Sequence, residues 1–206
     1  MFNELHNYND ADFIQDWAKQ HKAVFAKPSN AELLVVQQIL AIPHFQVLIS
    51  NKAILKGTPV DDAYSFEFHP QAYAPSRDYD LRFGQFAFRK HYYSRIGDFD
   101  SKEEFECAVW LDMQAQKGRI DFWVRNLVRK EGCSFFLQKA DGRFYPDFLC
   151  KLPGGVNLAV EYKGANQWTA TEDDRLIGGL WEELSDGRCR FVMATEKDWS
   201  RIDAKL

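Results

Sequence analysis

Two apolar segments joined by Pro153-Gly154-Gly155 constrain the fold of this chain more than any other feature of its sequence. Residues 144–152 and 156–163 have the aliphatic and aromatic composition of strands, and a Pro-Gly-Gly run is typical of a tight turn. Together they predict a β-hairpin. If its turn is centred on Gly154, Asp147 and Glu161 stand opposite each other, because each is seven residues away from that glycine.

Two carboxylates at opposed positions need a proton or a cation between them. Directly opposed side chains point to the same face of a sheet with Cβ atoms about 4.5–5.5 Å apart, where like charges destabilise the pairing. Asp147 and Glu161 are therefore predicted to bind Mg²⁺, with Mn²⁺ as a substitute. The backbone carbonyl of Tyr162 is a further candidate ligand, because hard cations prefer oxygen.

Lys163 completes this group. Side chains alternate along a strand, so Lys163 is expected on the same face as Glu161. There it would orient or help deprotonate a metal-bound water, and stabilise negative charge in the transition state of phosphodiester hydrolysis. The simpler interpretation is a surface salt-bridge cluster, in which Lys163 neutralises the two acids.

The pattern around the hairpin predicts an α/β fold for the C-terminal half. Ser101-Lys102-Glu103-Glu104 has the form of a capping box and begins a helix expected to end near residue 116. Residues 119–126 are ambiguous between strand and loop. Gly178 and Gly179 predict close packing of a second helix on a sheet. After the first helix the predicted elements are three strands, this second helix and a closing strand, at residues 134–138, 144–152, 156–163, 171–184 and 190–195.

Residues 1–98 are predicted to form a separate α+β extension of unassigned role. Two helices and four strands are expected in it, at residues 10–26, 29–42, 45–50, 53–55, 64–68 and 81–88. A candidate boundary at residues 96–100 separates this region from a second domain at residues 99–206.

Composition limits where the protein works and how it binds. No apolar stretch approaches the roughly 20 residues that span a bilayer, and the first ten residues lack the pattern of a signal peptide. Four cysteines, scattered singly, are expected to be reduced thiols of a cytoplasmic protein. The formal net charge of −4 predicts weak DNA affinity for the chain alone, because phosphate binding depends on basic side chains.

The segments Phe144-Tyr145-Pro146-Asp147-Phe148 and Val160-Glu161-Tyr162-Lys163-Gly164 resemble the PD-(D/E)xK nuclease superfamily. Trp123-Val124-Arg125-Asn126 and the runs at residues 99–105 and 177–187 add to this resemblance. Taken together, roughly residues 99–198 resemble the C-terminal nuclease domain of the restriction subunit of type III restriction enzymes. It implies a restriction-endonuclease-like αβββαβ core and Mg²⁺-dependent DNA cleavage in phage defence. It also implies an ATP-driven helicase or translocase module, which this chain would need in cis or trans because it has no phosphate-binding P-loop.

The resemblance also suggests individual roles. Asp147 and Glu161 resemble the metal ligands and Lys163 the catalytic lysine, while Glu104 resembles an acidic residue on the first helix near the metal. As the third residue of a capping box, Glu104 is equally explained as a helix cap.

Three further residues are weaker candidates for contacts with nucleic acid: Gln167, Arg175 and Arg125. Arg175 is as readily a solvated helix residue. A second copy of the chain is another candidate partner. Two other functions stay open, namely a catalytically silent DNA-binding or docking module of the same fold, and a nuclease for RNA or structured nucleic acid.

Overall fold

The computed structural model describes residues 66, 68, 73–130, 133–139, 142–164 and 171–206. The chain divides into two compact units, Met1–Thr58 with Gln138–Gly142 and Pro59–Leu137 with Arg143–Leu206. The second unit holds the four-stranded sheet and the helices described below. The helices and strands predicted between residues 10 and 55 lie outside the described residues.

A mixed four-stranded sheet forms the centre of this unit. Its strands are β1 (Phe122–Arg125), β4 (Phe148–Lys151), β5 (Asn157–Lys163) and β6 (Cys189–Thr195), in the order β1-β4-β5-β6. Strand β4 is antiparallel to both β1 and β5, whereas β6 runs parallel to β5. A crossover through a helix is therefore needed between β5 and β6. Two short strands, β2 (Leu137–Gln138) and β3 (Arg143–Phe144), pair separately.

The β4–β5 hairpin confirms the register predicted from its turn. Phe148 pairs with Val160 and Leu149 with Ala159, as a turn centred on Gly154 requires. The turn itself is a short 3₁₀ segment, η1 (Pro153–Gly155), in which Gly154 has φ 81°. That left-handed conformation favours glycine, which explains why the Pro-Gly-Gly run specifies this register.

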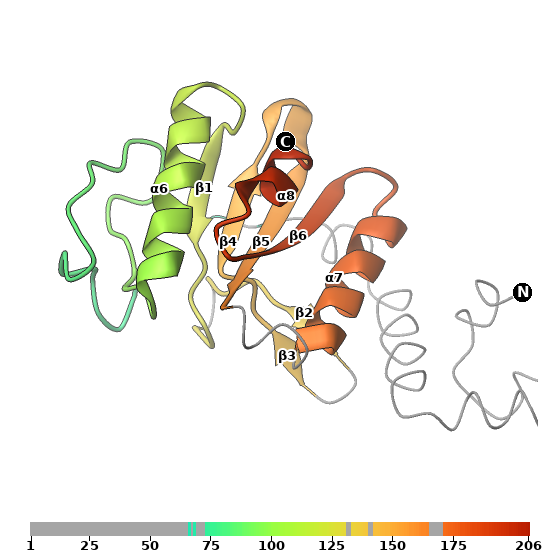
Figure 1. Cartoon of the computed structure of the whole chain (residues 1–206). Coiled ribbons are helices and arrows are strands. Elements are labelled where there is room, and N and C mark those ends of the chain that lie inside the picture. Colours follow the sequence, from blue (N-terminus) through green and yellow to red (C-terminus); the bar gives the residue numbers. More distant parts are fainter. Residues whose placement is uncertain (1–65, 67, 69–72, 131–132, 140–141, 165–170) are drawn as a thin grey trace, which may run out of the picture. The chain divides into compact units, whose positions relative to one another are not determined.

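Helices cover both faces of the sheet (Figure 1). Helix α6 (Lys102–Gln116) begins where the capping box predicted, with Ser101 Oγ accepting a hydrogen bond from the Glu104 N–H at 3.1 Å. Together with α8 (Trp199–Asp203), which the sequence patterns missed, α6 packs on the face that carries the main core. Fully buried members of this core are Phe99, Leu111, Trp123, Phe148, Leu158, Val160 and Ile202.

Helix α7 (Glu172–Leu184) supplies the crossover and packs on the other face of the sheet. Its approach to β6 is close at Gly178, where an added Cβ would lie 2.3 Å from the ring of Phe191. The neighbouring Gly179 faces open space. The predicted close packing of this helix is therefore confirmed. Of the two glycines, only Gly178 lies at the close contact.

One predicted strand is only partly present and another is absent. The first strand of the sheet is β1, in the segment that was ambiguous, whereas residues 134–138 contribute only the short β2 outside the four-stranded sheet. Residues 81–88 form no strand, because Leu81 has φ 70° and Gly84 has φ 136°, conformations incompatible with an extended strand. The aromatic side chains of this segment pack against the core instead.

Residues 73–98, which were assigned to the N-terminal region, belong to the same compact unit as the sheet. Tyr79, Phe86, Phe88 and Ile96 from this segment pack against the main core. Within the described residues this unit therefore begins well before the boundary expected at residues 96–100.

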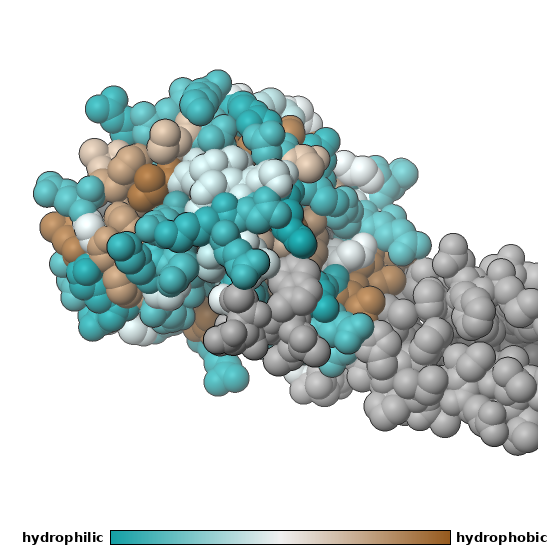
Figure 2. Space-filling view, viewed as in Figure 1, coloured by the Kyte–Doolittle hydropathy of each residue, from teal (hydrophilic) through white to brown (hydrophobic). Residues whose placement is uncertain are grey.

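The surface is mostly hydrophilic on the face shown in Figure 2, with scattered apolar patches. Among the described residues, no helix combines the length and apolar character needed to cross a membrane. The four cysteines are free thiols, three of them buried.

Candidate active site

The predicted site residues meet at one end of the sheet. Asp147 immediately precedes β4, Glu161 and Lys163 end β5, Arg125 ends β1, and Glu104 lies in the first turn of α6. The pairing directions bring these ends together, because β1 and β5 run opposite to β4.

Two hydrogen bonds connect Asp147 to β5 across the hairpin, one to Glu161 and one to Tyr162. The Asp147 backbone N–H donates to Glu161 Oε2 at 3.0 Å. In return, the Tyr162 backbone N–H donates to Asp147 Oδ2 at 2.9 Å. Each carboxylate is therefore fixed by a backbone group of the opposite strand. Asp147 and Glu161 are therefore neighbours across the hairpin, as its register predicts.

Lys163 neutralises Glu161. Its Nζ lies 2.5 Å from Glu161 Oε1, and the two side chains are 25% and 2% exposed. Burial, and then the charge of Asp147, hold the pKa of Glu161 well above its usual range, although Lys163 lowers it. Burial lowers the pKa of Lys163, but Glu161 raises it above the ordinary value. Lys163 is therefore an ammonium at neutral pH, suited to stabilising negative charge and not to accepting a proton.

Arg125 lies between two carboxylates of the site. Its Nη1 donates to Asp147 Oδ1 at 3.0 Å, and its Nη2 donates to Glu104 Oε2 at 2.8 Å. The Arg125 side chain is 5% exposed and its Nε has no hydrogen-bond partner. The structure thus places Arg125 among the acids of the site with its side chain largely buried, and its contact with nucleic acid stays a prediction.

Glu104 has the capping role considered for it and also lies at the site, while its part in catalysis stays a prediction. As a cap, its Oε2 accepts the Asp100 backbone N–H at 3.1 Å, and as a site residue it pairs with Arg125. Burial raises the pKa of Glu104 to about 7, an effect that Asp147 increases and Arg125 opposes. The cluster thus contains three acids, Asp147, Glu161 and Glu104, and two basic side chains, Arg125 and Lys163.

The backbone of Arg125 is held by side chains from residues 73–93. His91 Nε2 accepts the Arg125 N–H at 3.0 Å, and the Tyr73 hydroxyl donates to the Arg125 carbonyl at 2.9 Å. His91 Nδ1 lies 2.8 Å from the Tyr93 carbonyl oxygen, which requires the Nδ1–H tautomer and leaves Nε2 as the acceptor. Burial lowers the pKa of His91 to about 4, so this ring is neutral.

Asn126 holds the loop that precedes Asp147. Its side-chain amide donates to the carbonyls of Pro146 at 2.7 Å and Phe135 at 2.8 Å, and its backbone N–H donates to the Asp147 carbonyl at 2.9 Å. Asn126 is 3% exposed, so these bonds are shielded from water. The position of Asp147 is therefore set by β1 as much as by the hairpin.

The donor set suits a hard divalent cation. Asp147 and Glu161 offer carboxylate oxygens, and the Tyr162 carbonyl leaves β5 on the same side as its N–H, which points to Asp147. Within the described part of the chain, no three His, Cys, Asp or Glu side chains are placed to share one metal ion. Two carboxylates completed by water is a coordination that Mg²⁺ commonly accepts, so the residues fit such an ion.

The remaining candidates contribute less. Gln167 lies outside the described residues. Arg175, on α7, lies with its Nη1 3.5 Å from Thr171 Oγ1.

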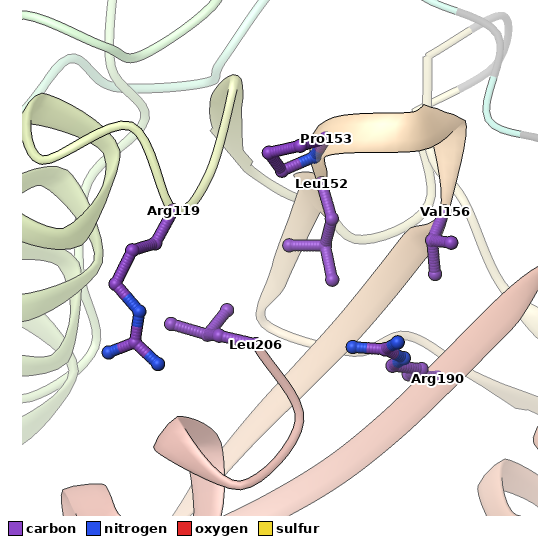
Figure 3. A pocket seen from close by; sticks show the side chains of 6 residues that line it. All are labelled: Arg119, Leu152, Pro153, Val156, Arg190 and Leu206. Carbon is purple, nitrogen blue, oxygen red and sulfur yellow. The ribbon is translucent and has the colours of Figure 1, made fainter.

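A cavity of about 170 Å³ lies at the opposite end of the hairpin (Figure 3). Two arginines and four apolar side chains line it: Arg119, Leu152, Pro153, Val156, Arg190 and Leu206. Both arginines already have partners, since Arg119 pairs with Asp203 and Arg190 donates to the Lys205 carbonyl. None of the side chains that line the cavity is acidic, and it is separate from the acidic cluster, so it is not the candidate active site.

Sequence reasoning missed the parts played by Arg125, His91 and Tyr73. For Arg125 there was a signal, since Trp123 and Arg125 are two residues apart and share a face of β1. A tryptophan on that face indicates burial and therefore a buried partner for the arginine. No comparable pattern marked His91 or Tyr73, which approach Arg125 from outside the sheet.

Comparisons of this chain with protein-family models, with curated proteins and with solved structures find no match. The function is therefore argued from the geometry of the site.

Proposed function

We propose that the protein is a metal-dependent DNA endonuclease that hydrolyses phosphodiester bonds at Asp147, Glu161 and Lys163. The observation that supports this most directly is the cross-strand bonding of Asp147 to Glu161 and to the Tyr162 N–H, with the Lys163 ammonium 2.5 Å from Glu161. Two acids and a lysine with raised pKa, held on rigid strand ends, provide the groups that phosphodiester hydrolysis requires.

Asp147 and Glu161 would hold the ion, with the Tyr162 carbonyl as a further oxygen. Bound Mg²⁺ supplies acidification of a water and neutralisation of phosphate charge. Lys163 donates hydrogen bonds to the negative oxygens that develop on the phosphate, because it stays protonated. Arg125 and the backbone N–H of Tyr162 keep Asp147 in place through its two carboxylate oxygens.

Binding of DNA by this chain alone is expected to be weak because its formal net charge is −4. A helicase or translocase module in the same assembly would supply the missing basic surface, whereas a second copy of the chain, the other candidate partner, would bring the same net charge of −4. Action in the cytoplasm as part of a restriction or phage-defence system belongs to the same proposal.

The test is nicking of supercoiled plasmid by the full chain at low salt with Mg²⁺ or Mn²⁺. We expect nicking by the wild type, its loss in Asp147→Ala, and its retention in Asp203→Ala, which removes a half-exposed acid at the other end of the unit. Absence of wild-type nicking at every metal concentration would reject the proposal. Parallel assays with single-stranded DNA and RNA decide whether the substrate is another nucleic acid.

A catalytically silent DNA-binding module is the second candidate. One observation favours it: both carboxylate oxygens of Asp147 already accept hydrogen bonds from the protein. Metal-independent DNA binding that persists in Asp147→Ala, together with no cleavage by the wild type, is the result this alternative predicts.

A further inference from the structure

We propose that the site binds a single divalent cation, between Asp147 and Glu161, and that the Arg125 guanidinium permanently occupies the place between Asp147 and Glu104 where a second cation would otherwise bind. This inference rests on the proposed function only in taking Asp147 and Glu161 as the metal ligands. It assigns Glu104 to holding Arg125 and not to binding metal.

The guanidinium fills the space between two carboxylates that come from different elements. One Nη is 3.0 Å from Asp147 Oδ1 and the other is 2.8 Å from Glu104 Oε2. A planar guanidinium presents these nitrogens in a fixed arrangement, so the two acids are held at a set spacing without any metal. A divalent ion placed between them would lie against a positive charge.

Arg125 cannot easily leave this position. Its side chain is 5% exposed, and its guanidinium carbon lies 5.4 Å from the ring centre of Phe148 and 5.9 Å from that of Phe99. His91 and Tyr73 hold its backbone on both sides. Arginine also stays charged at every physiological pH, so neither movement nor deprotonation opens the place it fills.

The basic residue beside Glu161 is less firmly held than Arg125. Glu161 pairs with Lys163, whose side chain is 25% exposed and whose ammonium is attached to a flexible aliphatic chain. Lys163 can therefore turn towards a phosphate when an ion arrives.

The number of bound ions tests the proposal. Titration of the full chain with Mn²⁺, followed by calorimetry and by electron paramagnetic resonance of free Mn²⁺, is expected to give one ion per chain for the wild type and for Glu104→Gln. Asp147→Asn is expected to bind at least tenfold more weakly. Two ions in the wild type, or an affinity reduced tenfold or more in Glu104→Gln, overturns the proposal.

Substitution of Arg125 provides the complementary test. Arg125→Gln removes the positive charge and is expected to bind two ions, with the second lost again in the double variant Arg125→Gln/Glu104→Gln. Arg125→Lys keeps the charge and is expected to bind one, as the wild type does. One ion in a folded Arg125→Gln contradicts the proposal. If this variant does not fold, as circular dichroism would show, the wild-type and Glu104→Gln counts decide.

Plasmid nicking by the same preparations separates this proposal from the proposed function. One bound ion without cleavage rejects the endonuclease and leaves the single-ion assignment standing. Cleavage with two bound ions supports the endonuclease and rejects the single-ion assignment. No bound ion in the wild type rejects both.

Discussion

The backbone N–H of Asp147 donates to the carboxylate of Glu161 across 3.0 Å, one step beyond the last paired residues of the β4–β5 hairpin. The ladder between the strands thus continues through a side chain where the backbone pairing ends. A substitution at Glu161 therefore changes both the charge of the site and the attachment of Asp147, whereas a substitution at Lys163 changes the charge alone.

Lys163→Met is expected to reduce metal-dependent cleavage by about 100-fold or more, because it removes a preorganised positive charge from the transition state. Mn²⁺ affinity should stay the same or increase, since the lysine no longer competes for Glu161. Rates of plasmid nicking and Mn²⁺ calorimetry measure the two effects. Lys151→Met is the matched control, because Lys151 donates to Asn157 at the far end of the same hairpin. Equal rates for Lys163→Met and the control would show that Lys163 takes no part.

Glu104 should make the metal-free protein less stable as the pH rises. Its pKa is about 7 in the folded state against 4.5 for the free group, so the folded state holds the extra proton between these values. Stability relative to Glu104→Gln is expected to fall from pH 4.5 to 7, by on the order of 3 kcal/mol at most. Urea unfolding across this range measures it, with the exposed Glu103→Gln as control. A difference between wild type and Glu104→Gln that does not change with pH would contradict the prediction.

His91 should act in the opposite direction. Its pKa of about 4 in the fold lies below the ordinary 6.5, so the unfolded state takes up the proton first. Its contribution to stability is complete above pH 6.5 and is lost as the pH falls towards 4. Titration of the imidazole by nuclear magnetic resonance should give a midpoint near 4 for His91. A midpoint near 6.5 would mean that the ring is solvated and does not accept the Arg125 N–H.

Adjacent glycines of α7 should respond in opposite ways to alanine. Gly178→Ala places a methyl group 2.3 Å from the Phe191 ring and should destabilise the protein, by about 1–3 kcal/mol for an overpacked core. Gly179→Ala enters open space and should stabilise it, by up to about 1 kcal/mol through higher helix propensity. Thermal unfolding of both variants tests the pair. Similar shifts in both would show that α7 does not approach β6 as closely as the structure has it.

Features set by local chemistry could be predicted from the sequence. The Ser101 cap placed the start of α6, and the turn at Gly154 set the register that faces Asp147 with Glu161. The prediction of a strand at residues 81–88 was wrong. The alternating aromatic side chains of this segment pack against the core from an irregular backbone, whose conformation depends on tertiary contacts.

The interior of the site was harder to predict. The position of Arg125 depends on Glu104 from α6 and on Asp147 from the hairpin, which are about 20 residues away on either side in the sequence. Spacing along the chain contains no information on such a three-element contact. A basic residue near a predicted nuclease motif therefore suggested phosphate binding, while its actual partners are the acids themselves.

Tyr73 and His91 form hydrogen bonds with the backbone carbonyl and N–H of Arg125. Both belong to a segment outside the nuclease-like motif. A fragment cut at the start of the motif would keep every acid and the lysine but lose both anchors, and the edge of β1 would be left open to water. The smallest portion of this protein that can be studied as a working unit consequently starts ahead of Tyr73, and motif boundaries are a poor guide for truncating it.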